Sequence, residues 1–561
     1  MTTGARNGVP DRVGSREAGA GSSAVSDTRA RAPGDRALDA HAVIDGRIIG
    51  RDLAGSPIVE RPVYLDYAAT TPVDPAVAAA MFACLSEGGE FGNPSSVTHV
   101  FGQRAAARVE EARGQVAALI GADPDEITFT SGATESNNLA ILGVARANSD
   151  RGRHVITTRI EHKAVLDPCK HLEREGFTVT YLTPDRQGHL DLDSVRAALR
   201  PDTVLVSLMF VNNEIGVIND VGAIGALCRE RGVAFHTDAA QAAGKIPIDV
   251  RQLSIDFLSF TAHKIYGPKG VGALYARRGS RPLLQPVSFG GGQERGLRPG
   301  TLPTHQIVGF GVACELVAKT LIPEQSRLTA LRDRLWVGLA AVGGTYLNGA
   351  ESPAGTSLRL QSPRAPSILN VSFEGVEGES LVTGLAGLAV STGSACNSAS
   401  GDPSYVLRAL GRDTQLAQSS LRFSVGRFTT PQDIDLAVEA LQREVARLRA
   451  LSPASEPSST PGEEVSGEAG GPGQETWVRF HLTVTGGIVK SARFKAYGCP
   501  HTLAVVDWLT QQLPGRGRDQ GPPGTPASWA EALSVPTEKL GRLLVVEDAL
   551  LACFAHWPSG S

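Results

Sequence analysis

Cysteine is scarce in this chain, and its scarcity limits the classes of protein that the sequence can encode. The 561 residues include seven cysteines, at positions 84, 169, 228, 314, 396, 499 and 553. Their number is odd, and no two of them are spaced like the ligands of a metal ion. A disulfide scaffold is therefore disfavoured, and a reducing compartment, the cytoplasm, is the predicted location.

Long apolar runs and a strong excess of charge are missing as well. Lys and Arg number 54 against 58 Asp and Glu, which leaves a formal net charge of −4. So small a charge gives no indication of a nucleic-acid partner. No apolar run approaches the roughly 20 residues that a membrane span needs. We therefore expect neither nucleic acid nor a membrane among the partners.

The composition changes along the chain and divides it into five predicted regions. The first lacks periodic apolar positions and the apolar core of a signal peptide, which is typical of a disordered leader. A later stretch rich in Ser, Pro, Glu and Gly is typical of a flexible linker. The regions are the leader (1–55), a large domain (56–325), a small α/β lobe (326–451), the linker (452–474) and a C-terminal unit (475–561).

Short apolar strands alternate with helical segments through the large domain. The predicted strands are Ile127–Thr130, His154–Thr158, Val179–Leu182, Thr203–Met209, Ala234–Thr237 and Phe257–Phe260. This alternation predicts an α/β fold with a mainly parallel sheet covered by helices. In the C-terminal unit we expect two strands, a helix from Thr502, a Pro- and Gly-rich loop over 513–526 and a last helix.

Lys264 follows a buried strand, and its position suits a reactive amine. The stretch Phe257–Gly270 begins with the strand and reaches Lys264 in a short polar turn, between His263 and Tyr266. Partial burial lowers the pKa of a lysine amine and makes the amine a better nucleophile towards a carbonyl. Taken alone, Lys264 would be interpreted as an ordinary surface lysine.

Asp238, at the end of the preceding strand, supplies a partner for that lysine. A pyridoxal phosphate site needs a lysine for the Schiff base and a carboxylate that keeps the pyridine nitrogen protonated. Two strands of one parallel sheet can place Asp238 beside Lys264. The pair predicts an enzyme that uses pyridoxal 5'-phosphate.

A strand-to-helix turn of small residues, Ser131–Asn138, is a natural place for the phosphate of such a cofactor. Free backbone N–H groups, the hydroxyl of Thr134 and the positive end of a helix dipole would all favour an anion there. The alternative is an ordinary helix cap.

Cys396 and Arg422 mark a second chemical centre. Cys396 lies in a loop of small polar residues, Val390–Ser400, which favours an exposed and reactive thiol over a buried one. Arg422 lies in a strand-like run, where its charge needs a partner. A substrate carboxylate and a structural ion pair are both open as that partner.

With these pieces assembled, residues 62–450 resemble the cysteine desulfurases, fold-type I pyridoxal phosphate enzymes that supply sulfur for iron–sulfur clusters. The long loop around Cys396 is similar to the NifS/IscS type of the family. The motifs are Tyr-Leu-Asp-Tyr-Ala-Ala-Thr-Thr-Pro (64–72), Phe-Gly-Asn-Pro-Ser-Ser (91–96), Thr-Ser-Gly-Ala-Thr-Glu-Ser-Asn (130–137), Glu-His-Lys-Ala-Val (161–165), Val-Asn-Asn-Glu-Ile-Gly (211–216), Ala-His-Lys-Ile-Tyr-Gly-Pro-Lys-Gly (262–270), Gly-Gly-Gly-Gln-Glu-Arg-Gly (290–296), Gly-Ser-Ala-Cys (393–396) and Pro-Ser-Tyr-Val-Leu-Arg-Ala-Leu-Gly (403–411).

The resemblance implies a role for each candidate residue. Lys264 would form the Schiff base and move the Cα proton, Asp238 would bind the pyridine nitrogen, and His162 would stack on the ring. The implied cofactor-binding residues are Lys264, Asp238, Gln241, Ala133, Thr134, His162, Asn213, Thr261, His263 and Thr301. Asn213 and Arg422 would also hold the substrate carboxylate, and the implied catalytic residues are Cys396, Lys264 and His162.

The resemblance also implies partners. Cys396 would attack the sulfur of L-cysteine, leaving L-alanine and an enzyme persulfide for an iron–sulfur scaffold or another sulfur acceptor protein. Thr301 would reach the phosphate in a partner subunit's site, which implies a homodimer. No intrinsic metal site is expected, although Cys396 would be a shared cluster ligand during transfer. The sequence departs from the family pattern at Asn397, where threonine is expected, and at Pro299, where serine is expected.

Two other functions remain open at this point. A selenocysteine lyase or a related class-V aminotransferase is the alternative enzyme, although the Cys396 loop argues against an aminotransferase. An inactive assembly adaptor is the alternative outside enzymes. The presence together of Lys264, Asp238, His162 and Cys396 argues against the adaptor.

The C-terminal unit resembles iron–sulfur scaffold proteins of the NifU/IscU type, mainly through Gly487–Cys499 and more weakly through Val546–Leu550. Such scaffolds need three cysteines and an aspartate or histidine. Only Cys499 matches, and Arg542 stands at the place of the last cysteine. Since one thiolate cannot hold a cluster, we expect a degenerate scaffold fold without a metal. It would serve as a tethered docking partner, as a sulfur relay for Cys396, or only as a stabilising appendage.

Overall fold

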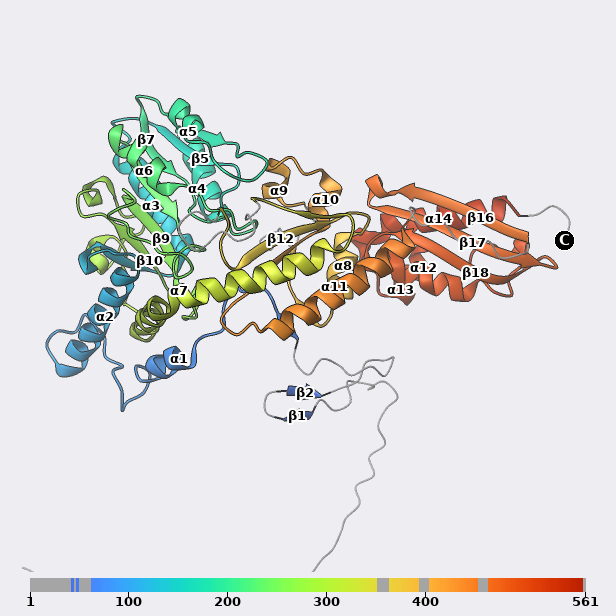
Figure 1. Ribbon diagram of the computed structural model, residues 1–561, viewed down its shortest axis with the longest axis horizontal. Coiled ribbons are helices and arrows are strands. Elements are labelled where there is room, and N and C mark those ends of the chain that lie inside the picture. Colours follow the sequence, from blue (N-terminus) through green and yellow to red (C-terminus); the bar gives the residue numbers. More distant parts are fainter. Residues whose placement is uncertain are drawn as a thin grey trace, which may run out of the picture. The chain divides into compact units, whose positions relative to one another are not determined.

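The computed structural model describes residues 42–44, 47–49, 62–350, 363–392, 403–452 and 463–557 (Figure 1). The chain divides into two compact units, Met1–Arg61 and Pro62–Ser561. In the first unit, β1 (Ala42–Ile44) and β2 (Arg47–Ile49) pair as an antiparallel hairpin. The rest of the predicted leader lies outside the described residues.

A seven-stranded sheet is the scaffold of the second unit. Its order is β4-β10-β9-β8-β7-β5-β6. The strands are β4 (Ile127–Thr130), β5 (His154–Thr158), β6 (Thr178–Leu182), β7 (Thr203–Ser207), β8 (Ala234–Asp238), β9 (Phe257–Thr261) and β10 (Gly272–Ala276). The five strands from β9 to β6 run parallel, which confirms the predicted mainly parallel sheet. The unpredicted β10 lies antiparallel between β9 and β4.

Most strands of this sheet are buried on both faces, because helices pack against it. The helices of this part of the chain are α1 (Pro75–Phe82), α2 (Val100–Leu119), α3 (Ala133–Ala147), α4 (Lys163–Arg174), α5 (Leu192–Ala198) and α6 (Val221–Glu230). A short 3-10 turn, η2 (Ala262–Lys264), follows β9 directly. The predicted order of strand, turn and lysine is therefore present.

The long helix α7 (Thr304–Ala340) runs from the part of the large sheet towards β12 (Ile368–Phe373) (Figure 1), and it belongs to two hydrophobic cores. Ile307 and Phe310 pack in the core of the large sheet, and Leu328 and Leu335 pack in the next core. The domain boundary that we placed at residue 325 lies inside this helix, and the division into domains stays a prediction. Among the described residues, α7 is also the one helix whose length and apolar composition would suffice to cross a membrane.

The second core surrounds a four-stranded antiparallel sheet in the order β11-β12-β15-β14. Its strands are β11 (Thr345–Leu347), β12 (Ile368–Phe373), β14 (Ser391–Thr392) and β15 (Ser420–Ser424). The early strand β3 (Val63–Tyr64) pairs in parallel with β13 (Leu388–Ala389) and so joins this lobe. The helices here are α8 (Gly378–Gly384), α9 (Tyr405–Ala409), α10 (Thr414–Gln418) and α11 (Pro431–Leu451).

The C-terminal unit is α+β, with the antiparallel sheet β16-β17-β18 against helices. Its elements are β16 (Glu463–Gly471), β17 (Thr476–Thr485), β18 (Ile488–Tyr497), α12 (Pro500–Gln512), α13 (Pro526–Ala532) and α14 (Leu540–Ala555). Helix α13 begins at the end of the predicted loop and was not predicted. Its capping box at Thr525 is the local signal that we missed.

The linker prediction is wrong over 463–471, because these residues form β16. Glycine there permits close packing and does not mark a flexible segment. A Cβ atom at Gly467 would lie 2.3 Å from the backbone nitrogen of Cys553 on α14. At Gly470 the backbone φ is +78°, a conformation that glycine adopts without strain. Composition alone could not separate these two uses of glycine.

Candidate active site

The parallel sheet brings Asp238 and Lys264 together. Asp238 is the last residue of β8, and Lys264 ends the 3-10 turn that follows β9. These strands are neighbours, with Asp238 opposite Ser259 in the parallel register. Because the carboxyl ends of parallel strands meet at one edge, both side chains reach the same cavity.

That cavity has a volume of about 540 Å³ and collects nearly all of the predicted site. Of the predicted residues that the structure describes, all but Thr301 line it. They are Ala133, Thr134, His162, Asn213, Asp238, Gln241, Thr261, His263, Lys264 and Arg422. They come from the ends of β8 and β9 and the turns that follow them, from the middle of β15, from the first turn of α3 and from the loops that follow β5 and β7.

The amine of Lys264 lies against the turn that follows β3. Its Nζ donates to the carbonyl oxygen of Ala68 and, at 2.8 Å, to that of Ala69. Gln241 also donates to the Ala68 carbonyl, at 2.9 Å, and accepts from the buried Lys245 at 3.3 Å. Burial, and then the charge of Lys264, lowers the pKa of Lys245 to about 7. Lys245 lies behind the cavity, and no motif or spacing in the sequence singled it out.

A buried amide fixes the carboxylate of Asp238. Asn137, on α3, donates to Asp238 Oδ2 at 2.7 Å, and the backbone N–H of Ala240 donates to Oδ1 at 2.9 Å. Both side chains are buried. Asn137 is a site residue that sequence reasoning missed, although it lies within the quoted motif 130–137. Its place one turn after Ala133, on the face of α3 towards β8, was the available signal.

The two histidines of the cavity are held as neutral rings. His162 caps α4, and its Nδ1 accepts the N–H of Ala164 at 3.1 Å, which requires an unprotonated Nδ1. His263 Nδ1 lies 3.2 Å from Thr70 Oγ1. Burial, followed by the nearby lysine charges, lowers the pKa of His263 to about 4. His263 therefore carries no charge at neutral pH.

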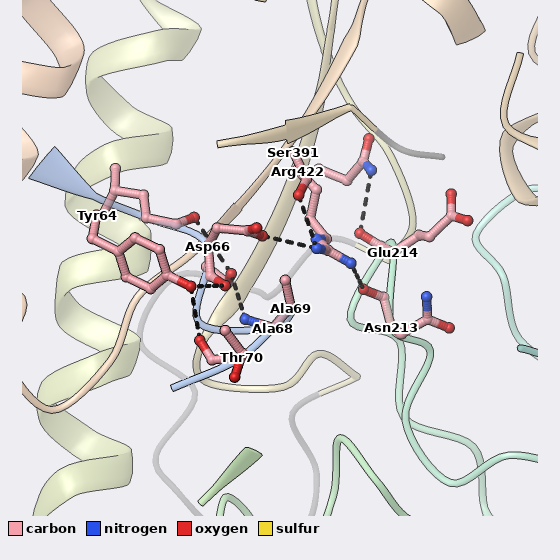
Figure 2. Close-up of polar contacts among 12 residues, drawn as sticks. Tyr64, Asp66, Ala68, Ala69, Thr70, Asn213, Glu214, Ser391 and Arg422 are labelled. Carbon is pink, nitrogen blue, oxygen red and sulfur yellow. Dashed lines mark hydrogen bonds and ion pairs between the residues drawn. The ribbon is translucent and has the colours of Figure 1, made fainter. Parts of the chain in front are cut away.

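Arg422 is held by three partners around its guanidinium group (Figure 2). Nη2 donates to Asp66 Oδ1 at 2.8 Å and to Ser391 Oγ at 3.2 Å, while Nη1 donates to the Asn213 carbonyl at 3.0 Å. The side chains of Arg422 and Asp66 are 4% and 18% exposed. The structural ion pair that the sequence left open is therefore present. Asp66 is a second residue of the site that we missed.

The residues fit a pyridoxal phosphate molecule. The cavity offers a lysine amine, a buried carboxylate opposite it and the first turn of α3, whose N–H groups suit a phosphate. Two amide oxygens, Oδ1 of Asn137 and Oδ1 of Asn213, are buried without a partner within the chain. Unpaired buried acceptors of this kind are expected where a ligand provides the donors.

Two predicted residues lie elsewhere. Thr301 is exposed and does not line the cavity of its own chain. Cys396, with 393–402, lies outside the described residues. The second thiol of interest, Cys499, is fully buried at the start of α12, where its sulfur lies 3.4 Å from Thr502 Oγ1. In this position Cys499 does not present a thiol to an incoming persulfide.

Comparison with known proteins gives a consistent result over the part of the chain that forms the cavity. Residues 63–437 match the aminotransferase class-V family. The chain is 56% identical over 392 residues to the cysteine desulfurase IscS of Pectobacterium atrosepticum. This alignment covers 70% of the chain and 95% of that protein. The IscS of Escherichia coli (strain K12 / DH10B) matches with the same identity and coverage.

Solved structures agree with the sequence relatives. A NifS-like protein aligns with a TM-score of 0.62 and 36% identity, covering 69% of this chain and all of that one. DndA from Streptomyces lividans aligns with a TM-score of 0.54 and 44% identity, covering 64% of this chain and 99% of that one. These matches establish the fold-type I architecture. The likeness of the C-terminal unit to a scaffold protein stays a prediction.

Proposed function

The chain belongs to the cysteine desulfurases of the aminotransferase class-V family, and from that premise we propose that it converts L-cysteine to L-alanine and a persulfide on Cys396. The observation that carries the proposal is the single cavity that Lys264, Asp238 and Arg422 share. It combines a Schiff-base lysine, a carboxylate for a pyridine nitrogen and an arginine for an amino-acid carboxylate.

Pyridoxal 5'-phosphate, when bound, supplies an electron sink for the carbon atoms of the substrate. Asp238, which Asn137 orients, would keep the pyridine nitrogen protonated, and His162 would cover the ring. The first turn of α3, with Ala133 and Thr134, would hold the phosphate together with Thr261 and His263. The contacts of Gln241 with Ala68 and Lys245 fix its amide and leave one N–H. That N–H would donate to the ring hydroxyl.

Lys264 and Arg422 would handle the substrate. Arg422, with Asn213, would bind the carboxylate of L-cysteine, and this would orient the amino group towards Lys264. The amine of Lys264 would take the Cα proton and return it. When the substrate frees that amine from the cofactor, the carbonyl oxygens of Ala68 and Ala69 are the acceptors that would hold it.

Sulfur transfer is balanced without any external oxidant. The Cys396 thiolate attacks the substrate sulfur and forms an S–S bond, while the bond between that sulfur and the substrate Cβ breaks. The electron pair of the broken bond stays with Cβ, which takes a proton and becomes the methyl group of L-alanine. The enzyme keeps a persulfide, and an iron–sulfur scaffold or another thiolation acceptor removes its outer sulfur.

The lysine provides the first test of the cofactor assignment. The purified protein should absorb near about 420 nm, as a lysine Schiff base of pyridoxal phosphate does. Lys264→Ala should lose this band and all alanine formation from L-cysteine. A wild-type protein without the band would contradict the proposal, and so would a variant that keeps full turnover.

We also propose a homodimer in which Thr301 serves the partner's site. Thr301 is exposed in its own chain, and Phe289, near the start of the same loop, is 86% exposed. Mixing Thr301→Ala with Lys264→Ala chains tests this arrangement, because one site of the mixed dimer would then be intact. Activity above that of either parent supports the exchange of Thr301, and no recovery contradicts it.

A reducing compartment, the cytoplasm, completes the proposal. All cysteines among the described residues are free and buried, namely 84, 169, 228, 314, 499 and 553. A persulfide is also a product that thiols discharge, so the chemistry suits a thiol-rich medium.

A further inference from the structure

Two side chains at the start of α9 tie this helix to residues that flank the cavity. Ser404 Oγ donates to Glu214 Oε2 at 2.5 Å, and the hydroxyl of Tyr405 donates to the carbonyl oxygen of Glu161 at 2.6 Å. Glu214 directly follows Asn213, and Glu161 directly precedes His162. Both bonds therefore end one residue away from a side chain that lines the cavity.

The hydrogen bond between Ser404 and Glu214 is buried, and it uses the only hydroxyl hydrogen of the serine. Ser404 is 1% exposed and Glu214 is 4% exposed. Ser404 Oγ also accepts the N–H of Leu407 at 3.2 Å and thereby caps α9. Its single hydroxyl hydrogen thus goes to Glu214. A carboxylate acceptor makes such a bond shorter and stronger than a neutral acceptor does.

The described residues on either side of the segment that carries Cys396 are both held by hydrogen bonds near the cavity. At one end, Ser391 on β14 pairs with Arg422 on β15 and accepts from its guanidinium group. At the other end, Ser404 is bound to Glu214. Figure 2 shows Ser391, Arg422, Asn213 and Glu214 side by side. Arg422 and Asn213 are themselves joined by a hydrogen bond of 3.0 Å.

We propose that Glu214 is a positioning residue for sulfur transfer, which through Ser404 holds the C-terminal end of the Cys396 segment against the residues that bind the substrate carboxylate. The proposal rests on the desulfurase function proposed above. It also gives a role to the motif 403–411, to which that function assigns none. Tyr405 supplies a second, neutral anchor at the same place.

The charge environment of Glu214 is consistent with this role. Burial raises the pKa of its carboxyl to about 7, while the hydrogen bond from Ser404 and the charge of Arg422 act in the opposite direction. Ser404 caps α9, and Arg422 lies on β15. The carboxylate is thus ionised over the upper part of the neutral range, where the link to Ser404 is strongest.

The test separates substrate binding from sulfur transfer in the holoenzyme. The absorbance change on adding L-cysteine reports binding, and the mass gain of one sulfur atom on Cys396 in a single turnover reports transfer. For Ser404→Ala and Glu214→Gln we expect an unchanged absorbance response and persulfide formation slower by roughly 10- to 100-fold. Ser404→Ala removes the link and Glu214→Gln makes its acceptor neutral. Because both changes act on the same link, the double variant should be no slower than the slower single variant.

Two further variants separate the effect of losing the Ser404–Glu214 hydrogen bond from the effect of destabilising a short helix. Ser404→Thr keeps the hydroxyl and should restore transfer. Asp413→Ala removes the cap of α10, a neighbouring helix of equal length, and should leave transfer unchanged. Equal losses in Ser404→Ala and Asp413→Ala would overturn the positioning role, and so would additive losses in the double variant or a lost absorbance response. A wild-type enzyme without a persulfide would overturn the desulfurase function itself.

Discussion

The guanidinium group of Arg422 already has a negative partner, and in the proposed function this partner would limit how strongly a substrate carboxylate binds. Asp66 Oδ1 lies 2.8 Å from Nη2, and Arg422 Nε is buried without a partner. The arginine therefore keeps its Nε–H and one Nη1–H for a ligand, while its charge is partly compensated. If Arg422 binds the substrate carboxylate as proposed, Asp66 should lower the affinity for the substrate while it stabilises the buried arginine.

Asp66→Asn isolates that compensation, because asparagine still accepts from Nη2 but carries no charge. We expect tighter binding of L-cysteine and of L-alanine, seen as a lower Kd in absorbance titrations. We also expect a loss of about 2 kcal/mol in the free energy of unfolding, since a buried arginine then lacks its counter-charge. Weaker ligand binding together with unchanged stability would show that Asp66 only orients Arg422.

The carboxyl of Glu214 predicts a pH dependence with a defined sign. Its pKa is raised to about 7, so the carboxyl loses its proton as the pH rises through 7. The hydrogen bond from Ser404 then becomes stronger, because its acceptor is charged. The ratio of the wild-type to the Glu214→Gln single-turnover rate should therefore rise between about pH 6 and pH 8. Taking this ratio cancels the titration of the Cys396 thiol, which both proteins share. A ratio that stays flat or falls would contradict the assignment.

Residues that react can be predicted from sequence more readily than residues that orient them. Lys264 and Asp238 stood at strand ends, where the chemistry of a pyridoxal enzyme requires them, and the structure places both in one cavity. Asp66, Asn137 and Glu214 act through contacts with residues far along the chain. Asp66, for example, meets Arg422 across more than 350 positions. No local pattern contains such a pairing.

At the scale of secondary structure, elements that depend on tertiary contacts were also harder to predict than elements with a local pattern. Six strands of the large sheet were predictable because they are short and apolar, and most of them are separated by helices. Strand β16 was not, since its Ser, Glu and Gly residues also suit a linker. Its pairing with β17 and the close approach of α14 determine the strand, and both contacts are tertiary. Helix α7 extends past the predicted boundary for a similar reason, because its two halves serve two different cores.

Gly467→Ala should destabilise the C-terminal unit. The new methyl group would meet the backbone of α14, 2.3 Å from Cys553 N and 2.5 Å from Ala549 O. We expect a loss of about 1 to 3 kcal/mol in the free energy of unfolding. Tryptophan fluorescence during thermal unfolding would report it, since Trp529 and Trp557 lie in that core. Gly471→Ala, in the same strand, is the matched control, because nothing lies within 4 Å of its Cβ position.

The molecule combines a desulfurase body with a C-terminal unit that packs on its smaller lobe. Ser380 on α8 donates to the Gly498 carbonyl at 2.7 Å, and Lys539 pairs with Glu379 at 2.7 Å. Leu503 contacts both the second and the third core. The relatives are nearly complete without such a unit, since 95% of IscS aligns with 70% of this chain.

A chain that ends after Ser452 should therefore still release alanine from L-cysteine at the wild-type rate. Its thermal unfolding temperature should fall, because the truncation exposes apolar surface on the smaller lobe. A truncated protein that binds the cofactor but does not turn over would instead assign the C-terminal unit a part in catalysis. That outcome would revive the relay role for Cys499, which its burial otherwise disfavours.

The most direct test of the central claim is alanine formation from L-cysteine, in the presence of a reductant, by the wild type and by Cys396→Ala. Desulfuration through a persulfide predicts alanine and sulfide in a one-to-one ratio from the wild type. The variant should keep its band near about 420 nm and make no alanine. Equal alanine from both proteins would contradict the account, because the sulfur would then leave without the Cys396 thiol.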